Sequence, residues 1–435
     1  MTSFALFAHR RFLPLFLTQF LGALNGNLFK NASIVLILYR LGNGQMAGGK
    51  VLATIAIGLF VLPFFLFSAT AGNLADRFDK AVVIRASKCF EIAAAMLAAY
   101  ALATDIAWML LTALFLLGTQ AALFGPLKYG ILPDLLAPEE LLAANGLIEA
   151  GTFLAILAGT LIGSLTVLTT DGILIVQTMV VATAVLGWIT SLAIPPTRAR
   201  APQLAIGWNM ATETSLLLRD VAASPSLLAS ILGVSWFWLA GATYLTQFPA
   251  FAKDALNAGP DVVSLFLVMF SIGISIGSML CQRLLRGKAS LRFGSAGALG
   301  MALFGLDFVF SATPLGNTNG ELATAATFLA HPSSWRLLAD LMGTAISAGV
   351  YVVPLYTVMQ QLAPPSHRAR VIAANNVINA LFMTVAAGIA AASLAAGLGI
   401  KDILAAMAAA NIAVAILTHR QNRRLACAPT DGAGS

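Results

Sequence analysis

Polar side chains interrupt the first long apolar stretch of this chain. The segment from Phe20 to Ala32 reads FLGALNGNLFKNA and carries a lysine among asparagines. Because successive residues of an α-helix turn by about 100°, Gln19, Asn27, Lys30 and Asn31 share one arc of roughly 120°. A charge at the bilayer centre costs roughly 2.5–3.5 kcal/mol on insertion scales, so this arc should face a cavity or a neighbouring helix. An amino group and amides on one face could bind the polar end of a ligand.

A second polar pair lies further along the chain. Asn145 and Glu149 are four residues apart, so both side chains project from the same face of a helix. Two opposite charges in apolar surroundings suggest an ion pair between Lys30 and Glu149, which is a hypothesis at this point. The alternative for each asparagine is a hydrogen bond that joins two helices, because amides often serve that purpose within membranes.

An aromatic and polar stretch, SWFWLAGATYLTQ, runs from Ser235 to Gln247. Trp236, Trp238 and Gln247 could line a cavity. The alternative is that the tryptophans mark the membrane interface, where aromatic residues are enriched. The spread of these residues across a full span favours the cavity.

Three acidic residues also lie within apolar segments. Asp307 and Asp340 are near the ends of their segments, so they could extend toward the membrane interface or be solvated. Glu91 lies in the middle of its segment, where a position facing lipid would be costly. The sequence indicates no partner for Glu91.

The composition predicts a membrane protein. Hydrophobic residues make up 59% of the 435 residues and charged residues only 10%, whereas soluble domains carry about 25% charged residues. Apolar runs of about 20 residues recur along the chain, long enough to cross a hydrocarbon core of roughly 30 Å as helices. The three cysteines, Cys89, Cys281 and Cys427, are far apart and follow neither a disulfide pattern nor a metal-site pattern.

Polar breaks divide the apolar runs into twelve predicted transmembrane helices, six on each side of the break at 195–225. We therefore predict an all-α membrane protein with two six-helix halves, at 1–194 and 226–420. The segment 195–225 is the predicted cytoplasmic linker, and 421–435 is a cytoplasmic tail. The predicted spans are 12–40, 51–75, 81–103, 106–128, 139–168, 173–194, 226–250, 262–285, 292–312, 337–362, 369–397 and 400–418.

The distribution of basic residues predicts the orientation. Assigning the termini and every second loop to one side places nineteen of the 25 lysines and arginines there. Five fall on the other side, and Lys30 is inside a span. Because basic residues accumulate in cytoplasmic loops, both termini should be cytoplasmic. The same distribution accounts for the formal net charge of +7 without nucleic acid as a partner.

An internal repeat supports the division into halves. Pro126 to Ala150 reads PLKYGILPDLLAPEELLAANGLIEA, and Pro354 to Ala380 reads PLYTVMQQLAPPSHRARVIAANNVINA. Asn375 and Asn379 are the counterparts of Asn145 and Glu149. Two parallel repeats of six helices are typical of the major facilitator superfamily, so we predict that fold with pseudo-symmetric halves. Chance similarity of alanine-rich helices is the alternative.

Between the second and third predicted spans the chain reads GNLADRFDK, from Gly72 to Lys80. This resembles the G-x-L-A-D-R-x-G-R/K motif of the superfamily, with Asp79 where a glycine is usual. The resemblance implies a cytoplasmic conformational latch. In such a latch the acid, Asp76, contacts the opposite half, and Arg77 and Lys80 join an ion network that holds one access state. An ordinary cluster of loop charges is the alternative.

Five stretches carry a narrower resemblance: QFLGALNGNLFKNA, GNLADR, FGPLKYGILPDLL, ANGLIEA and SWFWLAGATYLTQFP. Together they resemble the bacterial lysophospholipid transporters (LplT-type), most of all the form fused to an acyltransferase and an acyl-carrier-protein synthetase. The resemblance extends from about residue 12 to 418. It implies inward transport of lysophospholipids, chiefly lysophosphatidylethanolamine, across the bacterial inner membrane by alternating access. Reacylation would then belong to a separate enzyme.

The resemblance also implies a central cavity. Polar groups near Lys30, Asn145 and Glu149 would hold a zwitterionic headgroup, while apolar walls would hold the single acyl chain. The candidate substrate contacts are Gln19, Asn27, Lys30, Asn31, Lys128, Asn145, Glu149, Trp238, Gln247, Asn375 and Asn379.

The chain departs from the family pattern in its first span. That pattern is usually Asn-Asp-Asn or Gly-Asp-Asn, whereas this chain has Gly26 between two asparagines. The missing acid is a candidate for cation coupling or for headgroup binding. Coupling to sodium or protons therefore stays open: the protein could be uncoupled or could use Glu149 instead. We expect no metal and no other cofactor.

The sequence is also compatible with two other functions. One is uptake or efflux of another amphipathic small molecule by the same fold, and the other is a non-transporting subunit that docks acyltransferases. The sequence contains no phosphate loop, and its polar segments are too short for a catalytic domain, so we do not expect an enzyme. We expect a monomeric, multi-pass inner-membrane protein, with a lysophospholipid as substrate and an acyltransferase/acyl-ACP synthetase as a possible partner.

Overall fold

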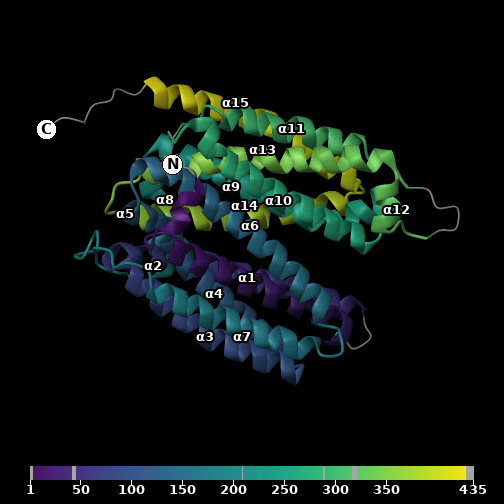
Figure 1. Ribbon diagram of the computed structural model, residues 1–435, viewed down its shortest axis with the longest axis horizontal. Helices are drawn as coiled ribbons and strands as arrows, with labels where there is room; N and C mark the ends of the chain where they lie inside the picture. Colours follow the sequence, from purple (N-terminus) through teal and green to yellow (C-terminus); the bar gives the residue numbers. More distant parts are fainter. Residues whose placement is uncertain (1–2, 42–45, 208, 288–289, 316–320, 428–435) are drawn as a thin grey trace. The chain divides into compact units, whose positions relative to one another are not determined.

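The computed structural model describes residues 3–41, 46–207, 209–287, 290–315 and 321–427. Each of the twelve predicted spans coincides with one long helix in these residues (Figure 1). The long helices are α1 (Leu13–Leu36), α2 (Met46–Arg77), α3 (Lys80–Thr104), α4 (Ala107–Gly130), α6 (Leu141–Thr166), α7 (Gly172–Leu192), α9 (Pro225–Ala250), α10 (Pro260–Leu285), α11 (Gly294–Phe310), α13 (Pro332–Leu362), α14 (Arg368–Ala395) and α15 (Ile400–Cys427). The end of the predicted tail, 428–435, lies outside the described residues.

Shorter helical elements join the long helices or extend them. α8 (Met210–Ala222) lies within the predicted linker, and α5 (Leu132–Leu135) makes one turn after α4. The π-helical turns η2 (Ile37–Leu41) and η4 (Phe251–Ala255) extend α1 and α9. The remaining elements are η1 (Ser3–Ala8), η3 (Pro138–Glu140) and α12 (Ala325–Ala330).

Contacts divide the chain into two units. Unit 1 comprises Met1–Ala223 and Ala363–Ala380, and unit 2 comprises Ser224–Leu362 and Leu381–Ser435. Helix α14 therefore begins in unit 1 and ends in unit 2. The boundaries of the halves at 194 and 226 stay a prediction.

Most of the long helices have the composition of membrane spans. Ten of them, in the part of the chain that the structure describes, are long and apolar enough to cross a membrane. Helix α11 is apolar but has only 17 residues. Helix α3 is less apolar because Lys80, Arg85, Lys88 and Glu91 all lie within it. The protein is thus a multi-pass membrane protein, and the charges of α3 need partners inside the fold.

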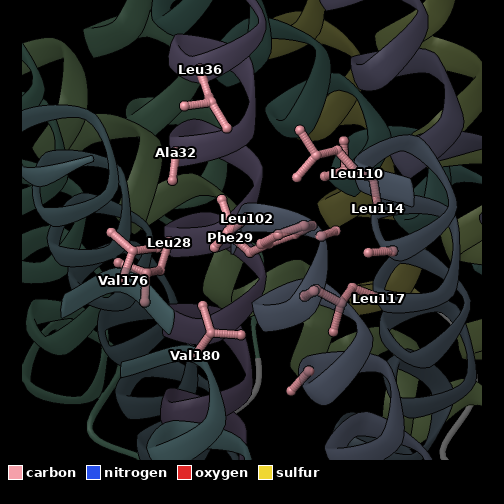
Figure 2. Close-up of a cluster of buried hydrophobic side chains, with 14 of the residues drawn as sticks. Leu28, Phe29, Ala32, Leu36, Leu102, Leu110, Leu114, Leu117, Val176 and Val180 are labelled. Carbon is pink, nitrogen blue, oxygen red and sulfur yellow. The ribbon is translucent and has the colours of Figure 1, made fainter. Parts of the chain in front are cut away.

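Unit 1 is built around α1, which packs against α6 on one side and α7 on another. Helix α4 packs against α2 and α3, and α3 also contacts α7 (Figure 1). Figure 2 shows the resulting apolar core, in which Leu28 and Phe29 of α1 lie near leucines of α4 and valines of α7. This core occupies one face of α1 and leaves the opposite face of the helix for polar contacts.

Small residues let α1 and α6 approach closely. A Cβ atom on Gly159 of α6 would lie 2.6 Å from the carbonyl oxygen of Leu24. Only glycine leaves room for the α1 backbone at this position, which is how helices often associate where the hydrophobic effect does not drive contact. The α1–α6 contact is therefore set by backbone geometry, and it positions the polar residues on both helices.

Unit 2 is built around α13, which packs against α9, α10 and α11. Helix α15 packs against α11 and α9. Aromatic rings fill the space between α9, η4, α10 and α11, and neighbouring ring centres lie 4.7–6.4 Å apart. The rings belong to Tyr244, Phe248, Phe251, Phe266, Phe270 and Phe308.

Candidate functional site

The predicted polar face of α1 is present in unit 1. Lys30 donates a hydrogen bond to Asn27 Oδ1 over 2.9 Å, and its Nζ atom lies 5.4 Å from the centre of the Phe60 ring. Asn31 Nδ2 donates to the carbonyl oxygen of Asn27 over 2.8 Å and to Thr160 Oγ1 of α6 over 3.1 Å. The structure thus brings Asn27, Lys30 and Asn31 together, and Asn31 also joins two helices.

Gln19 lies two helical turns earlier and is almost fully buried against α6. Its Oε1 atom accepts a hydrogen bond from Thr152 Oγ1 over 3.1 Å, while its Nε2 atom has no partner. A buried amide donor without a partner costs free energy, so this group is available for a polar atom of a ligand.

Glu149 lies in the middle of α6 with no exposed surface. Its Oε2 atom accepts a hydrogen bond of 2.5 Å from the hydroxyl group of Tyr129, at the end of α4. The positive charge that acts on Glu149 comes from Lys128. The Oε1 atom has no hydrogen-bond partner. Asn145 lies one turn earlier on α6 and is also buried.

The hypothesised ion pair between Lys30 and Glu149 is not formed. Both residues are described, and no contact within 4.0 Å joins their charged atoms. Lys30 contacts Asn27 and Phe60, whereas Glu149 contacts Tyr129 and is acted on by the charge of Lys128. The sequence-based pairing was wrong because it considered charge signs alone and left Lys128 out.

A buried charged cluster that the sequence did not predict lies on another face of α1. Lys88 and Glu91 of α3 form an ion pair of 2.6 Å, and their side chains are exposed by only 0% and 1%. Asn25 Nδ2 donates to Glu91 Oε1 over 3.2 Å, and the Lys88 amino group lies 5.0 Å from the centre of the Phe124 ring. Glu91 therefore has the partner that the sequence did not indicate. The orientation count included Lys88 on the cytoplasmic side, whereas its side chain is buried within α3.

The i,i+3 spacing of Lys88 and Glu91 inside an apolar run was a signal that could have found this pair. The pair also needs space beside α1. A Cβ atom on Gly22 would lie 2.5 Å from Lys88 Nζ, so a side chain there would push the amino group away.

The acid of the predicted latch contacts the start of α14. Both Asp76 carboxylate oxygens accept hydrogen bonds of 3.1 Å, from the backbone nitrogens of Ala369 and Arg370. These residues belong to the second half of the sequence and to unit 1 of the structure. A carboxylate at a helix N-terminus satisfies free N–H groups and complements the helix dipole. Gly72 permits the contact, because its Cβ would lie 2.8 Å from Ala373 Cβ.

The basic residues of the predicted latch differ in their partners. Lys80 forms an ion pair of 2.9 Å with Asp134, and the side chains are exposed by 1% and 3%. Arg200, in the linker, binds the other Asp134 oxygen through Nε and Nη2 over 2.9 and 2.7 Å. Arg77 lies over the ring of Phe78 at 5.3 Å and has no carboxylate within ion-pair distance among the described residues.

Asp79, where the superfamily motif has a glycine, has a local structural role. It precedes the first turn of α3 and accepts a hydrogen bond of 2.8 Å from Ala81 N. It also accepts bonds from the nitrogen and hydroxyl group of Thr197, over 3.0 and 2.9 Å. The start of α3 and the linker are thereby joined. His367 directly precedes α14, and its pKa is lowered first by burial and then by the charge of Arg370.

The repeat asparagines lie on the part of α14 that belongs to unit 1. Asn375 is fully buried, and neither polar atom of its side chain has a partner. Asn379 is buried as well. Asn375 thus resembles Glu149 and Gln19 in offering a buried polar atom that no protein group satisfies.

The predicted residues of unit 2 lie on α9. Trp238 Nε1 donates to the hydroxyl group of Tyr356 over 3.0 Å, and Trp236 Nε1 donates to Asn411 Oδ1 over 2.8 Å. These bonds join α9 to α13 and α15. Gln247 is partly buried, and its Nε2 atom lies 3.5 Å from Thr246 Oγ1.

Two observations limit the chemistry of these groups. Among the described residues, no group of three or more His, Cys, Asp or Glu side chains is arranged to hold a metal ion. A cavity of about 590 Å³ in unit 1 has none of the predicted site residues in its lining. It is lined by Arg40, Ala103, Val167, Leu168, Thr169, Thr170, Asp171, Ile173, Leu174 and Gln177.

Comparison with characterised proteins finds relatives that share one name in different bacteria. The chain is 28% identical over 315 residues to the lysophospholipid transporter LplT of Photorhabdus laumondii, covering 70% of this chain and 69% of that protein. It is 27% identical over 368 residues to LplT of Serratia proteamaculans, with coverage of 81% and 80%.

Solved structures and a family model agree on the fold. The human organic anion transporter MFSD10 superposes with a TM-score of 0.72 at 15% identity, covering 95% of this chain and 98% of that one. The Escherichia coli fucose:proton symporter FucP gives 0.67 at 14% identity, with coverage of 95% and 99%. The model of the Major Facilitator Superfamily matches residues 15–387. With its long helices and internal repeat, the chain belongs to the major facilitator superfamily.

Proposed function

We propose that this protein is a secondary transporter of lysophospholipids. The observation that carries the proposal is the similarity to LplT proteins from several bacteria, over 70–81% of this chain. A lysophospholipid has one acyl chain and a phosphate-containing headgroup, so its transporter needs apolar walls and a few convergent polar groups. Unit 1 supplies such groups from α1, α6 and α14.

The headgroup site consists of unit 1 residues whose polar atoms are not all satisfied within the protein. Gln19 Nε2, Glu149 Oε1 and the Asn375 amide are buried without partners. A polar headgroup would supply the missing hydrogen bonds, which explains why such costly groups persist in an apolar fold. Asn27, Lys30, Asn31, Lys128, Asn145 and Asn379 complete the candidate set in unit 1, and Trp238 and Gln247 are the candidates in unit 2.

The proposed setting is the bacterial inner membrane, with both termini and the linker in the cytoplasm. The excess of lysine and arginine in alternate loops supports this orientation. Transport would be inward and proceed by alternating access, with Gly72, Asp76, Arg77 and Lys80 as the conformational latch. The contact of Asp76 with the first turn of α14 supports the latch, because opening it would expose buried donors.

The cellular role would be the return of lysophospholipids for reacylation. A separate acyltransferase with an acyl-ACP synthetase would act on the delivered lipid, and the transporter itself would be a monomer. Uptake or efflux of another amphipathic solute is the alternative function, because relatives with this fold include an organic anion transporter and a sugar symporter.

Reconstituted vesicles test the proposal. We expect purified protein to move lysophosphatidylethanolamine across the membrane of proteoliposomes faster than empty vesicles do. Sodium and proton gradients set separately would identify a coupling cation from the gradient that accelerates uptake. Movement of other amphiphiles but of no lysophospholipid would overturn the proposal in favour of the alternative.

A further inference from the structure

The charges within the membrane spans of unit 1 do not balance. Away from the helix ends, these spans contain Lys30, Lys88, Glu91 and Glu149, and Lys128 lies in the last turn of α4. Lys88 pairs directly with Glu91. The Lys128 amino group lies 4.8 Å from the centre of the Tyr129 ring, whose hydroxyl group binds Glu149, and the charges of Lys128 and Glu149 act on each other. These two combinations are neutral, so one positive charge is left over, and it belongs to Lys30.

Lys30 has no acidic partner in the part of the chain that the structure describes. Its contacts are the uncharged Asn27 oxygen at 2.9 Å and the face of Phe60 at 5.4 Å. An ammonium group has three donors, and only one of them is used within the protein. A cation inside a span is costly unless it has a functional partner. A phosphate group would provide both the charge and the acceptors that are missing.

The residue four positions before Lys30 explains the imbalance. Gly26 lies on the same face of α1, and a Cβ there would meet only the Phe60 ring, at 3.6 and 3.8 Å. An acidic side chain would therefore fit beside the ring that Lys30 covers, at the i,i+4 spacing that favours an ion pair. Glycine leaves the lysine unpaired.

We propose that the unpaired Lys30 makes this transporter select lysophospholipids with a net negative headgroup over zwitterionic ones. This inference rests on the proposed function and refines its substrate class. An anionic headgroup, such as phosphoglycerol, balances Lys30 through its phosphate and brings no second charge. A zwitterionic headgroup brings an ammonium group as well, which has to approach the surplus positive charge, while the charge of the remaining acid, Glu149, is already offset by Lys128.

Uptake of two lysolipids with the same acyl chain tests the inference in proteoliposomes. We expect wild-type protein to show a KM for lysophosphatidylglycerol about fivefold lower than for lysophosphatidylethanolamine, the upper end of what one partly solvated charge pair contributes. Gly26→Asp should abolish or reverse this ratio, because Asp at 26 neutralises Lys30. Gly26→Asn introduces a side chain of the same size as in Gly26→Asp but without the charge, so it should keep the wild-type ratio. Lys30→Met should lose the preference while retaining some uptake.

The outcomes separate the two proposals. If wild-type protein moves neither lysolipid, the proposed function fails. If it moves both with equal KM, or if Gly26→Asp and Gly26→Asn give the same ratio, the inference fails and lysophospholipid transport stands. The wild-type ratio needs no variant, so poor folding of a mutant protein leaves the test decisive.

Discussion

At the scale of single residues, buried ion pairs let charged helices pass through an apolar fold. Lys88 and Glu91 are withdrawn from solvent on α3, and Asn25 and the Phe124 ring complete their surroundings. Removing one member of such a pair leaves an uncompensated buried charge, whereas removing both leaves none. The cluster thus explains how α3 tolerates two charges near its middle.

Substitutions of this pair should show that dependence. We expect Glu91→Met to destabilise the protein by about 3–5 kcal/mol, because Lys88 stays charged and buried. The double variant Lys88→Met with Glu91→Met should recover most of that loss. The stability of both variants is measured by thermal unfolding in detergent, which is monitored through the loss of the monodisperse peak in size-exclusion chromatography. Equal losses for the single and double variants would contradict the ion-pair explanation.

Lys80 and Arg200, the two cations that bind Asp134, should contribute unequally to the stability of the fold. The Lys80 side chain is exposed by 1% and that of Arg200 by 40%. Arg200→Ala should cost less than about 1 kcal/mol, because a solvated pair contributes little. Asp134→Ala should cost about 3–5 kcal/mol, because it leaves Lys80 buried without a counter-ion. The same thermal assay compares the variants, and a larger loss for Arg200→Ala would rule out this ranking.

At the scale of elements, the α1–α6 contact depends on the absence of side chains. We expect Gly159→Val to lower the melting temperature, because its Cβ would meet the Leu24 carbonyl at 2.6 Å and force the helices apart. Gly58→Val is the matched control, since a Cβ there would have no neighbour within 4 Å. Differential scanning fluorimetry measures the two variants. The same melting temperature for both would show that close approach at Gly159 is unimportant.

The start of α14 depends on one carboxylate from α2. Asp76→Asn removes the charge that complements the helix N-terminus, which is worth roughly 0.5–2 kcal/mol for a good cap. Hydrogen–deuterium exchange should therefore accelerate at the amides of Ala369 and Arg370. Asp79→Ala is the control, because it removes the cap of α3 and should accelerate exchange at Ala81 instead. Unchanged exchange at both Ala369 and Arg370 would mean that Asp76 does not cap α14.

At the scale of the whole molecule, the charge distribution predicts which ends of the helices face the cytoplasm. Gln203 lies in the linker and Thr170 in the loop between α6 and α7, and both are exposed. In a cysteine-free background, we expect Thr170→Cys to react with a membrane-impermeant maleimide in intact spheroplasts. Gln203→Cys should react only after the membrane is permeabilised. Reaction of Gln203→Cys in intact spheroplasts would reverse the orientation.

The sequence by itself determined the architecture of this protein. Apolar runs of span length, the loop charges and the repeat at Pro126 and Pro354 predicted twelve helices and the fold, and the structure and family model agree. These features could be read directly because burial in a bilayer acts on continuous segments. The helical periodicity also placed Asn27, Lys30 and Asn31 on one face correctly.

Only the tertiary structure decided which charges are partners. Sequence reasoning paired Lys30 with Glu149 and left Glu91 alone, whereas the structure pairs Glu91 with Lys88 and gives Glu149 a hydrogen bond from Tyr129. Side-chain partners depend on how helices rotate and how closely they approach. The rotation and the separation of two helices are set by contacts between residues far apart in the sequence, such as Gly159 with Leu24. The sequence of one segment does not reveal such contacts. The unpaired state of Lys30 follows from that packing and from the glycine at position 26 together.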